Sequence, residues 1–372
     1  MSDLSVNSIL DASGGATTTI NGFTPTVSNM AGRNRIINGD MRIDQRNAGA
    51  ALSNPANGFA VDRFPFDRGV SAATVTVQQS TSAPTRFKNS LLVTVGTGAA
   101  TTSGDYSILR HAIEGYNVSD LKWGTAEAQV ITLSFWVRSS LTGLFGTSII
   151  NNAGNRRYVS SYTINIANTW EYKTITIPGD TTGTWETNNS RGLSLYFDMG
   201  VGSTYSASAG SWGTGSQIYG LTGGVKLLAN SGATFQLTGV QLEAGSVATP
   251  FEHRMYGQEL ALCQRYYRTW GGNSSHERLA VGFCFSTTQA RLDIPLSPNM
   301  RTTPTLTISS ASDWYVEGST GAAVGTAVTL DQASPRIAAV NFNVASGLTA
   351  GQGMHIVANS TLAARFNLSA EL

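Results

Sequence analysis

Charged side chains are scarce in this sequence of 372 residues, at 13% of the total where an ordinary globular protein has about 25%. The net charge is only +1, so no overall field draws the chain to nucleic acid or to an anionic lipid surface. Two cysteines, Cys263 and Cys284, are too few for a disulfide framework or a cysteine-based zinc site. Apolar runs stay shorter than the ~18 residues of a membrane helix. We therefore expect no nucleic-acid partner and no membrane insertion.

Apolar residues, by contrast, make up 41% of the chain and aromatic residues 9%, which is enough to build folded cores. The length predicts two or three domains. Most of the 24 basic residues are arginines, whose planar, bidentate contacts suit interfaces and buried pairs better than those of lysine.

Residues 1–32 differ from the rest, because they are polar and rich in glycine and threonine. Such a segment cannot bury a core of its own. Two interpretations remain open: a solvated tail, or an extended arm that orders on a partner through Val6, Ile9 and Leu10.

Residues 33–254 show strict alternation of apolar and polar side chains, again and again. VITLSFWVRSS places Ile131, Leu133, Phe135 and Val137 on one face of a strand. In ATFQLTGVQLEAG the phase slips after Gly239, which predicts a bulge there. Short strands separated by Gly, Asn, Asp and Thr clusters predict an all-β fold, an antiparallel sandwich or barrel.

The one good helix candidate is HRMYGQELALCQRYYRTW, which covers most of the segment 255–272 and which Gly271 and Gly272 would end. Its apolar residues recur at helical spacing, and its aromatic and arginine content is high. The helix either packs on a sheet or organises an oligomer, for which the candidate interface residues are Tyr256, Leu260, Tyr267, Arg268 and Trp270.

Residues 273–372 resume the period of two, for example in LAVGFCFSTT and AAVNFNVAS. About six strands in this length predict a second, smaller β-sandwich.

Four segments, RNRIINGDMRIDQRN, LSFWVRSS, NTWEYKTITIPG and TGVQLEAGSVATPFEHR, together resemble the jelly roll of carbohydrate-binding modules. With the ELALCQRYY helix and a C-terminal β domain after it, the order is similar to that of bacteriophage tail-fibre and other virion structural proteins. LSVNSILDASGG resembles the N-termini of such proteins from cyanobacterial and marine phages.

This resemblance implies a tail fibre or receptor-binding adhesin that attaches a virion to a host surface glycan or protein. The chain would be made in the host cytoplasm, dock to other virion proteins through residues 1–32, and form a homotrimer. A capsid-decorating or head-fibre protein is the alternative within the same class.

Jelly rolls of this type often hold a structural calcium ion, and here Arg42, Thr238 and Gly239 replace the expected carboxylates. Three aspartates, Asp40, Asp44 and Asp62, offer a rebuilt site, or they pair with neighbouring arginines. No other cofactor is implied.

Catalytic patterns are weak throughout. The four histidines are far apart, and no nucleophile elbow, P-loop or dinucleotide motif is present. Asp180, Glu186 and Asp198 fall where turn-forming carboxylates are common. We predict that the chain is not an enzyme, with a polysaccharide-degrading enzyme as the disfavoured alternative.

Aromatic rings that stack on sugars are the better chemical signal, and loop aromatics are the natural candidates. The sequence nominates Trp185, Tyr205, Trp212 and Tyr219 in the first β domain and Trp314 and Tyr315 in the second. Trp136 and Trp170, on strands, are predicted to pack instead. The alternatives for the loop residues are inward packing or trimer contacts.

Overall fold

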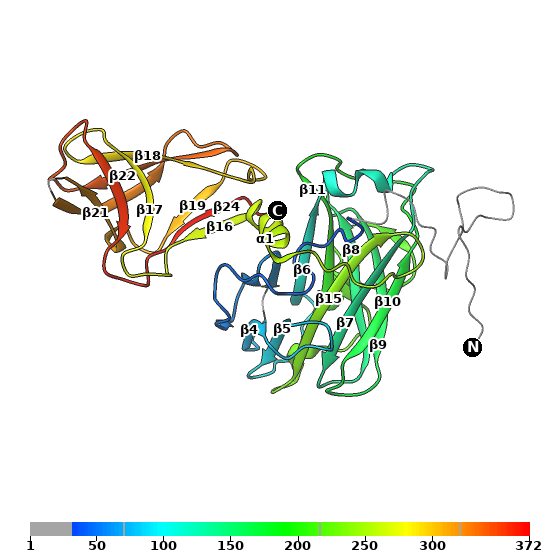
Figure 1. The fold of residues 1–372 in the computed structure, drawn as a ribbon. Helices are drawn as coiled ribbons and strands as arrows, with labels where there is room; N and C mark the ends of the chain where they lie inside the picture. The colour runs from blue at the N-terminus through cyan, green and yellow to red at the C-terminus, as the bar shows by residue number, and fades with distance from the viewer. Residues whose placement is uncertain (1–31, 70, 216, 320) are drawn as a thin grey trace, which may run out of the picture. The chain divides into compact units, whose positions relative to one another are not determined.

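The computed structural model describes residues 32–69, 71–215, 217–319 and 321–372 (Figure 1). The chain divides into two compact units, one ending at Arg254 and the other running from Met255 to Leu372. The predicted docking residues Val6, Ile9 and Leu10 lie outside the described residues.

The first unit consists of two antiparallel sheets. In spatial order, the six-stranded sheet contains β1 (Leu52–Ser53), β4 (Val75–Ser80), β5 (Ser90–Val95), β15 (Thr234–Ala244), β7 (Ile131–Ser139) and β10 (Glu171–Ile177). The seven-stranded sheet contains β13 (Trp212–Thr214), β9 (Arg156–Ile164), β8 (Gly143–Asn151), β11 (Arg191–Asp198), β6 (Tyr106–Glu114), β3 (Phe64–Gly69) and β2 (Asn57–Val61).

Smaller elements connect these strands. A two-stranded parallel pair joins β12 (Ser206–Ala207) to β14 (Gly220–Leu221). The 3-10 turns of this unit are η1 (Gly115–Asn117), η2 (Ser119–Leu121), η3 (Ser203–Tyr205) and η4 (Leu227–Ala229).

The core of the first unit lies between the two sheets, because alternate residues of each strand point inward. Phe135 of β7 is fully buried and meets Phe197 of β11 at 5.2 Å between ring centroids. Each such phenylalanine contributes about 1.5–3 kcal/mol by burial. The predicted jelly-roll β-sandwich and its strand phases are confirmed.

The predicted bulge at Gly239 is also confirmed. The pairing of β15 with β7 shifts register between Thr238 and Gln241, and Gly239 has a φ of 61°. Glycine adopts this left-handed conformation without the steric penalty of a side chain.

The second unit is the predicted smaller β unit, but its six main strands close into a barrel rather than two open sheets. Around the barrel the strands are β17 (Arg278–Cys284), β18 (Gln289–Pro295), β22 (Ile337–Val344), β21 (Gly321–Leu330), β20 (Trp314–Gly318) and β23 (Gly353–Ala358). A three-stranded sheet consists of β16 (Tyr267–Trp270), β24 (Phe366–Ser369) and β19 (Thr305–Ile308), and the turn η5 spans Ala311–Asp313.

The helix predicted over 255–272 is shorter than expected. Helix α1 spans Tyr256–Gln264, and the next residues form strand β16. Aromatic and β-branched residues favour a strand, and here Tyr267–Trp270 pair with Phe366–Ser369, almost one hundred residues later. None of the described helices has the length and apolar character needed to cross a membrane.

Candidate functional site

The outer face of the six-stranded sheet carries an aromatic platform. Trp136 of β7 and Tyr172 of β10 are direct cross-strand partners, with ring centroids 5.4 Å apart. The inward phase of β7 is occupied by core residues, so Trp136 must point outward. Tyr172 is 44% exposed and Trp136 is half-buried, which leaves ring surface open to solvent.

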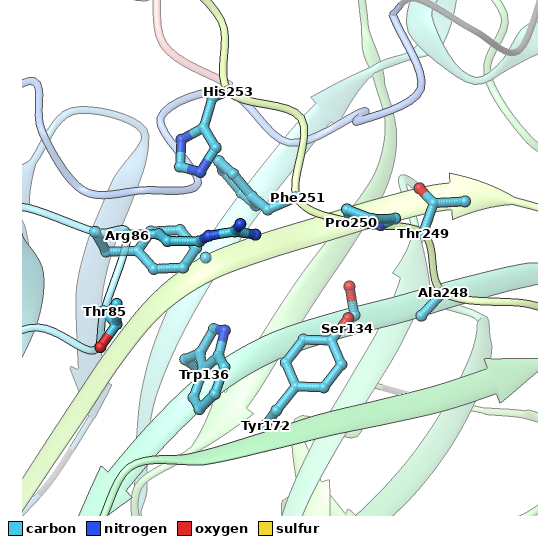
Figure 2. Close-up of a pocket in the computed structure, with 12 residues that line it drawn as sticks. Thr85, Arg86, Ser134, Trp136, Tyr172, Ala248, Thr249, Pro250, Phe251 and His253 are labelled. Atoms are coloured by element: carbon cyan, nitrogen blue, oxygen red, sulfur yellow. The ribbon is translucent and has the colours of Figure 1, made fainter. Parts of the chain in front are cut away.

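A second aromatic cluster faces this platform. Phe87, from the loop before β5, contacts Phe251 at 5.1 Å and His253 at 5.3 Å between ring centroids. Phe251 and His253 are themselves 4.8 Å apart. Figure 2 shows Phe251 and His253 on one side of the opening and Trp136 and Tyr172 on the other.

Hydrogen bonds to the opening segment of the unit fix the chain that carries Phe251 and His253. The Glu252 carboxylate accepts the backbone N–H groups of Gly32 and Asn34, each at 2.7 Å. Arg254 donates from Nη1 to the Ile36 carbonyl at 3.0 Å. The segment that carries Phe251 and His253 is therefore held in place by residues 32–36.

Gly239 lies between the two walls. A Cβ atom at this position would approach Phe87 Cζ to 2.7 Å and Trp136 Cδ1 to 3.1 Å. The bulge and its glycine therefore keep both rings close to the backbone of β15.

Together these groups enclose a groove of about 360 Å³, within the ~300–1,000 Å³ range of small-molecule sites. Thr85, Arg86, Ser134 and Thr249 also line the groove, and in the view of Figure 2 the Arg86 side chain extends between the two aromatic clusters. The described lining includes no carboxylate. Apolar ring faces with a few convergent donors and acceptors can bind an oligosaccharide by stacking and hydrogen bonding.

The loop tryptophans nominated by sequence form a different cluster. Trp185 and Trp212 each pack edge-on against Trp123, at 4.7 and 5.3 Å. Their indole N–H groups are occupied, since Trp185 donates to Asp180 at 3.2 Å and Trp212 donates to the Pro178 carbonyl at 2.9 Å. Both rings also pack against the hydrophobic core of the first unit, whereas Trp136 does not, so this arrangement favours the inward-packing alternative.

The nominated tyrosines also pack together, on the outer face of the seven-stranded sheet. Tyr205 and Tyr219 have ring centroids 5.5 Å apart, and both contact Tyr106. Tyr219 also contacts Tyr196 of β11. The structure therefore brings Tyr205 and Tyr219 together in this cluster, and Trp185 and Trp212 together in the tryptophan cluster. None of these four residues lines the aromatic groove.

In the second unit, Trp314 requires a correction. Its side chain is fully buried in the barrel core, so it has no surface to offer a receptor. Tyr315, the next residue on β20, is half-buried. Trp314 and Tyr315 lie between the charged residues Asp313 and Glu317, which made this stretch look exposed in the sequence. In the structure Trp314 points into the core, in phase with Val316 of the same strand.

Two of the nominated interface residues also require correction. Tyr267 and Arg268 are buried, Tyr267 pairs with Ser369 of β24, and Arg268 donates to the Pro298 carbonyl at 2.8 Å. Trp270 packs against Phe366. Tyr256, at 59% exposed, and the half-buried Leu260 keep free surface on α1.

The aspartates considered for calcium take part in other contacts. Asp40 pairs with Arg42 and Asp62 with Arg46, each at 3.1 Å. Asp44 accepts backbone N–H groups of its own turn. Among the described residues no cluster of three or more His, Cys, Asp or Glu side chains forms a metal site. The pairing alternative is therefore the one these contacts support.

The carboxylates considered for catalysis lie away from the groove. Asp180 receives two hydrogen bonds from Arg156, at 2.5 and 2.8 Å. Burial opposes ionisation of Asp180, but these bonds outweigh it and hold the pKa of the carboxyl below its usual value. Glu186 accepts from Asn188, and Asp198 is fully buried.

The groove residues were missed by the search for loop aromatics. A usable signal is present in the sequence, because Trp136 and Tyr172 occupy the polar phase of their strands. No such signal marks Phe87, Phe251 and His253. Phe87 contacts the other two only because the segment after β15 returns to the six-stranded sheet, which local sequence does not reveal.

Comparison with known proteins is limited to solved structures, because no protein-family model and no curated sequence matches the chain. A bacteriophage CBA120 tailspike domain matches 57% of this chain and 21% of its own, at 13% identity and a TM-score of 0.28. A xylan-binding domain from Paenibacillus barcinonensis matches 55% of this chain and 99% of its own, at 12% identity and a TM-score of 0.25.

A family 11 carbohydrate-binding module of a Clostridium thermocellum cellulase matches 56% of this chain and 100% of its own, at 15% identity and a TM-score of 0.26. The chain thus spans about a fifth of the tailspike it matches. Similarity this low does not indicate a function.

Proposed function

We propose that the first unit binds a neutral oligosaccharide in the aromatic groove. The observation that supports this most directly is the Trp136–Tyr172 platform, which faces Phe87, Phe251 and His253 across an open gap. Aromatic faces attract the C–H-rich faces of sugar rings, and a pair of walls can hold one ring between them.

The indole N–H of Trp136 adds a polar contact. Within the described part of the chain this nitrogen makes no hydrogen bond, whereas the N–H groups of Trp185 and Trp212 are bonded internally. Trp136 is therefore equipped to donate to a sugar hydroxyl while its ring stacks.

The proposed role is binding without catalysis. Glycoside hydrolysis commonly uses two carboxylates on either side of the scissile bond, and the described groove lining offers none. The resemblance to phage proteins extends this role to a virion adhesin, a tail fibre or receptor-binding protein of homotrimeric form. Several copies per particle would turn weak single-site binding into firm attachment. A capsid-decorating or head-fibre protein would use the same groove at another place on the particle.

The test begins with a glycan array probed with the full chain, followed by calorimetric titration of the best ligand. We expect Trp136→Ala to weaken binding by about 2 kcal/mol, roughly 30-fold in Kd. Tyr116→Ala is the matched control, because Tyr116 is 61% exposed and does not line the groove. Equal affinity of Trp136→Ala and the wild type, with both folded, would overturn the proposal.

A further inference from the structure

A second, polar pocket of about 180 Å³ lies on the outer face of the seven-stranded sheet. Arg110 of β6 and Tyr196 of β11 are direct cross-strand partners at this pocket. Asp67 of β3, Arg191 at the start of β11 and Gln217 also line it. All of these residues belong to the first unit, and none of them lines the aromatic groove.

The pocket has an excess of unused hydrogen-bond donors. Within the described part of the chain, Arg110 makes no hydrogen bond or ion pair, and its buried Nε has no partner. Arg191 donates from Nη2 to the Asn152 carbonyl at 3.0 Å, but its buried Nε is likewise without a partner. The Nη groups of Arg110 make no hydrogen bond within the described residues and are not buried, so they are open to an acceptor that enters the pocket.

Tyr196 supplies a third donor. Its side chain is only 5% exposed, and among the described residues its hydroxyl has no hydrogen-bond partner. Its ring is fixed by Tyr219, 5.1 Å away between centroids. The hydroxyl is therefore held in place at the pocket without a protein acceptor.

Acceptors in the pocket are mostly occupied. The Asn151 side-chain oxygen already accepts the backbone N–H groups of Asn155 and Arg156. The Gln217 side-chain oxygen accepts from the Tyr219 hydroxyl. Asp67 is the one lining carboxylate, and it is not within ion-pair distance of Arg110. Burial raises the pKa of Asp67, and the charge of Arg110 offsets this only in part.

We propose that this pocket binds an oxyanion carried by a sugar, a carboxylate or a sulfate group, through Arg110, Arg191 and Tyr196. Guanidinium groups match the planar geometry of a carboxylate, and such charge-assisted bonds are about twice as strong as neutral ones. Two arginines against one carboxylate give the lining a net positive charge. The small volume limits the ligand to a single acidic ring or its anionic substituent. This inference does not depend on the aromatic groove.

The test is a set of binding titrations of the full chain with galacturonate, galactose 6-sulfate and galactose, in which NMR signals of the protein report the affinity for each sugar. We expect at least one acidic sugar to bind about tenfold or more tightly than galactose, and the preferred one identifies the oxyanion. Arg110→Gln should remove that preference, and Arg110→Lys should keep part of it by retaining the charge. Asp67→Asn should tighten binding severalfold, because it removes a negative charge beside the anion.

Arg278→Gln is the control, since that arginine is exposed in the second unit. Trp136→Ala should also leave acidic-sugar binding unchanged, which separates this site from the groove. Three results would each overturn the inference: galactose binding as tightly as both acidic sugars, unchanged binding by folded Arg110→Gln, or weaker binding by Asp67→Asn. The Asp67 variant keeps the question answerable if Arg110→Gln does not fold.

Discussion

The two outer faces of the sandwich cover the same core but differ in the side chains that they expose. The six-stranded face presents aromatic rings around a glycine bulge, where Trp136 and Tyr172 offer ring surface. The seven-stranded face presents arginine and tyrosine donors, with Arg110 opposite Tyr196. Inward strand positions are fixed by packing, so the outward phase is free to encode binding chemistry. Under the two proposals, one sandwich carries two separate recognition surfaces, one for a neutral glycan and one for an acidic sugar.

The largest expected effect is a crossed loss of binding. Trp136→Ala should lose about 30-fold in affinity for a neutral oligosaccharide and nothing for an acidic monosaccharide. Arg110→Gln should lose about tenfold or more in affinity for the acidic monosaccharide and nothing for the neutral oligosaccharide. The two sites share no residue, so the double variant should show both losses independently. Calorimetry with both ligands on all four proteins measures this. A single variant that weakens both ligands would show that the faces are not separate sites.

A smaller effect is expected from Gly239→Ala. The added methyl would meet Phe87 and Trp136 and would strain a backbone at φ 61°, so neutral-glycan affinity should fall about tenfold, near 1.4 kcal/mol. Gly223→Ala is the matched control, because Gly223 has a φ of 76° with no atom within 4 Å of the added carbon. Similar binding by both alanine variants would show that Gly239 does not shape the groove.

The smallest effect concerns Asp198, which lies at the end of β11 under the seven-stranded face. Burial raises the pKa of Asp198 to about 6, although Lys226 and backbone N–H groups act against it. The folded state therefore holds this proton at a higher pH than the unfolded chain does. The protonated Asp198 therefore stabilises the folded state fully below about pH 4, and this stabilisation is lost as the pH rises through 6. The free energy of unfolding should fall by on the order of 1 kcal/mol between pH 5 and pH 7 from this group.

His111 has the opposite sign. Burial, with Arg63 nearby, lowers the pKa of His111 well below its usual value, so stability from this group falls as the pH drops below about 6.5. The useful quantity is therefore the difference between wild type and Asp198→Asn in urea unfolding at pH 5 and pH 7. Because both proteins contain His111, its effect cancels in the comparison. We expect the free energy of unfolding of the wild type, measured relative to that of the variant, to fall between pH 5 and pH 7. Parallel curves for the two proteins would contradict the assignment.

Strand phase could be predicted from sequence, and partners distant in sequence could not. The alternation around Phe135 and the slip at Gly239 were sufficient to predict the sandwich and its bulge. The end of α1 was not predictable, because Tyr267 belongs to a strand whose partner lies near the C-terminus. Closure of the second unit into a barrel likewise depends on pairing between β17 and β23, which no local window contains.

Strand phase was also the better guide to the residues of the proposed groove. Loop position nominated Trp185 and Trp212, but both rings pack against Trp123 and both N–H groups find internal acceptors. Trp136 was assigned to packing, although it stands in the outward phase of a strand whose inward phase is filled by phenylalanine and aliphatic residues. Strand phase is therefore a better guide to an exposed ring than loop position is in this fold.

The most direct test of the aromatic groove is NMR observation of the indole N–H signals of the seven tryptophans during titration with a neutral oligosaccharide, each signal being assigned by a Trp→Phe variant. The account predicts that the Trp136 signal shifts with saturation at the calorimetric Kd, while those of the internally bonded Trp185 and Trp212 remain in place. A saturating ligand that shifts Trp185 or Trp212 and leaves Trp136 unmoved would contradict it.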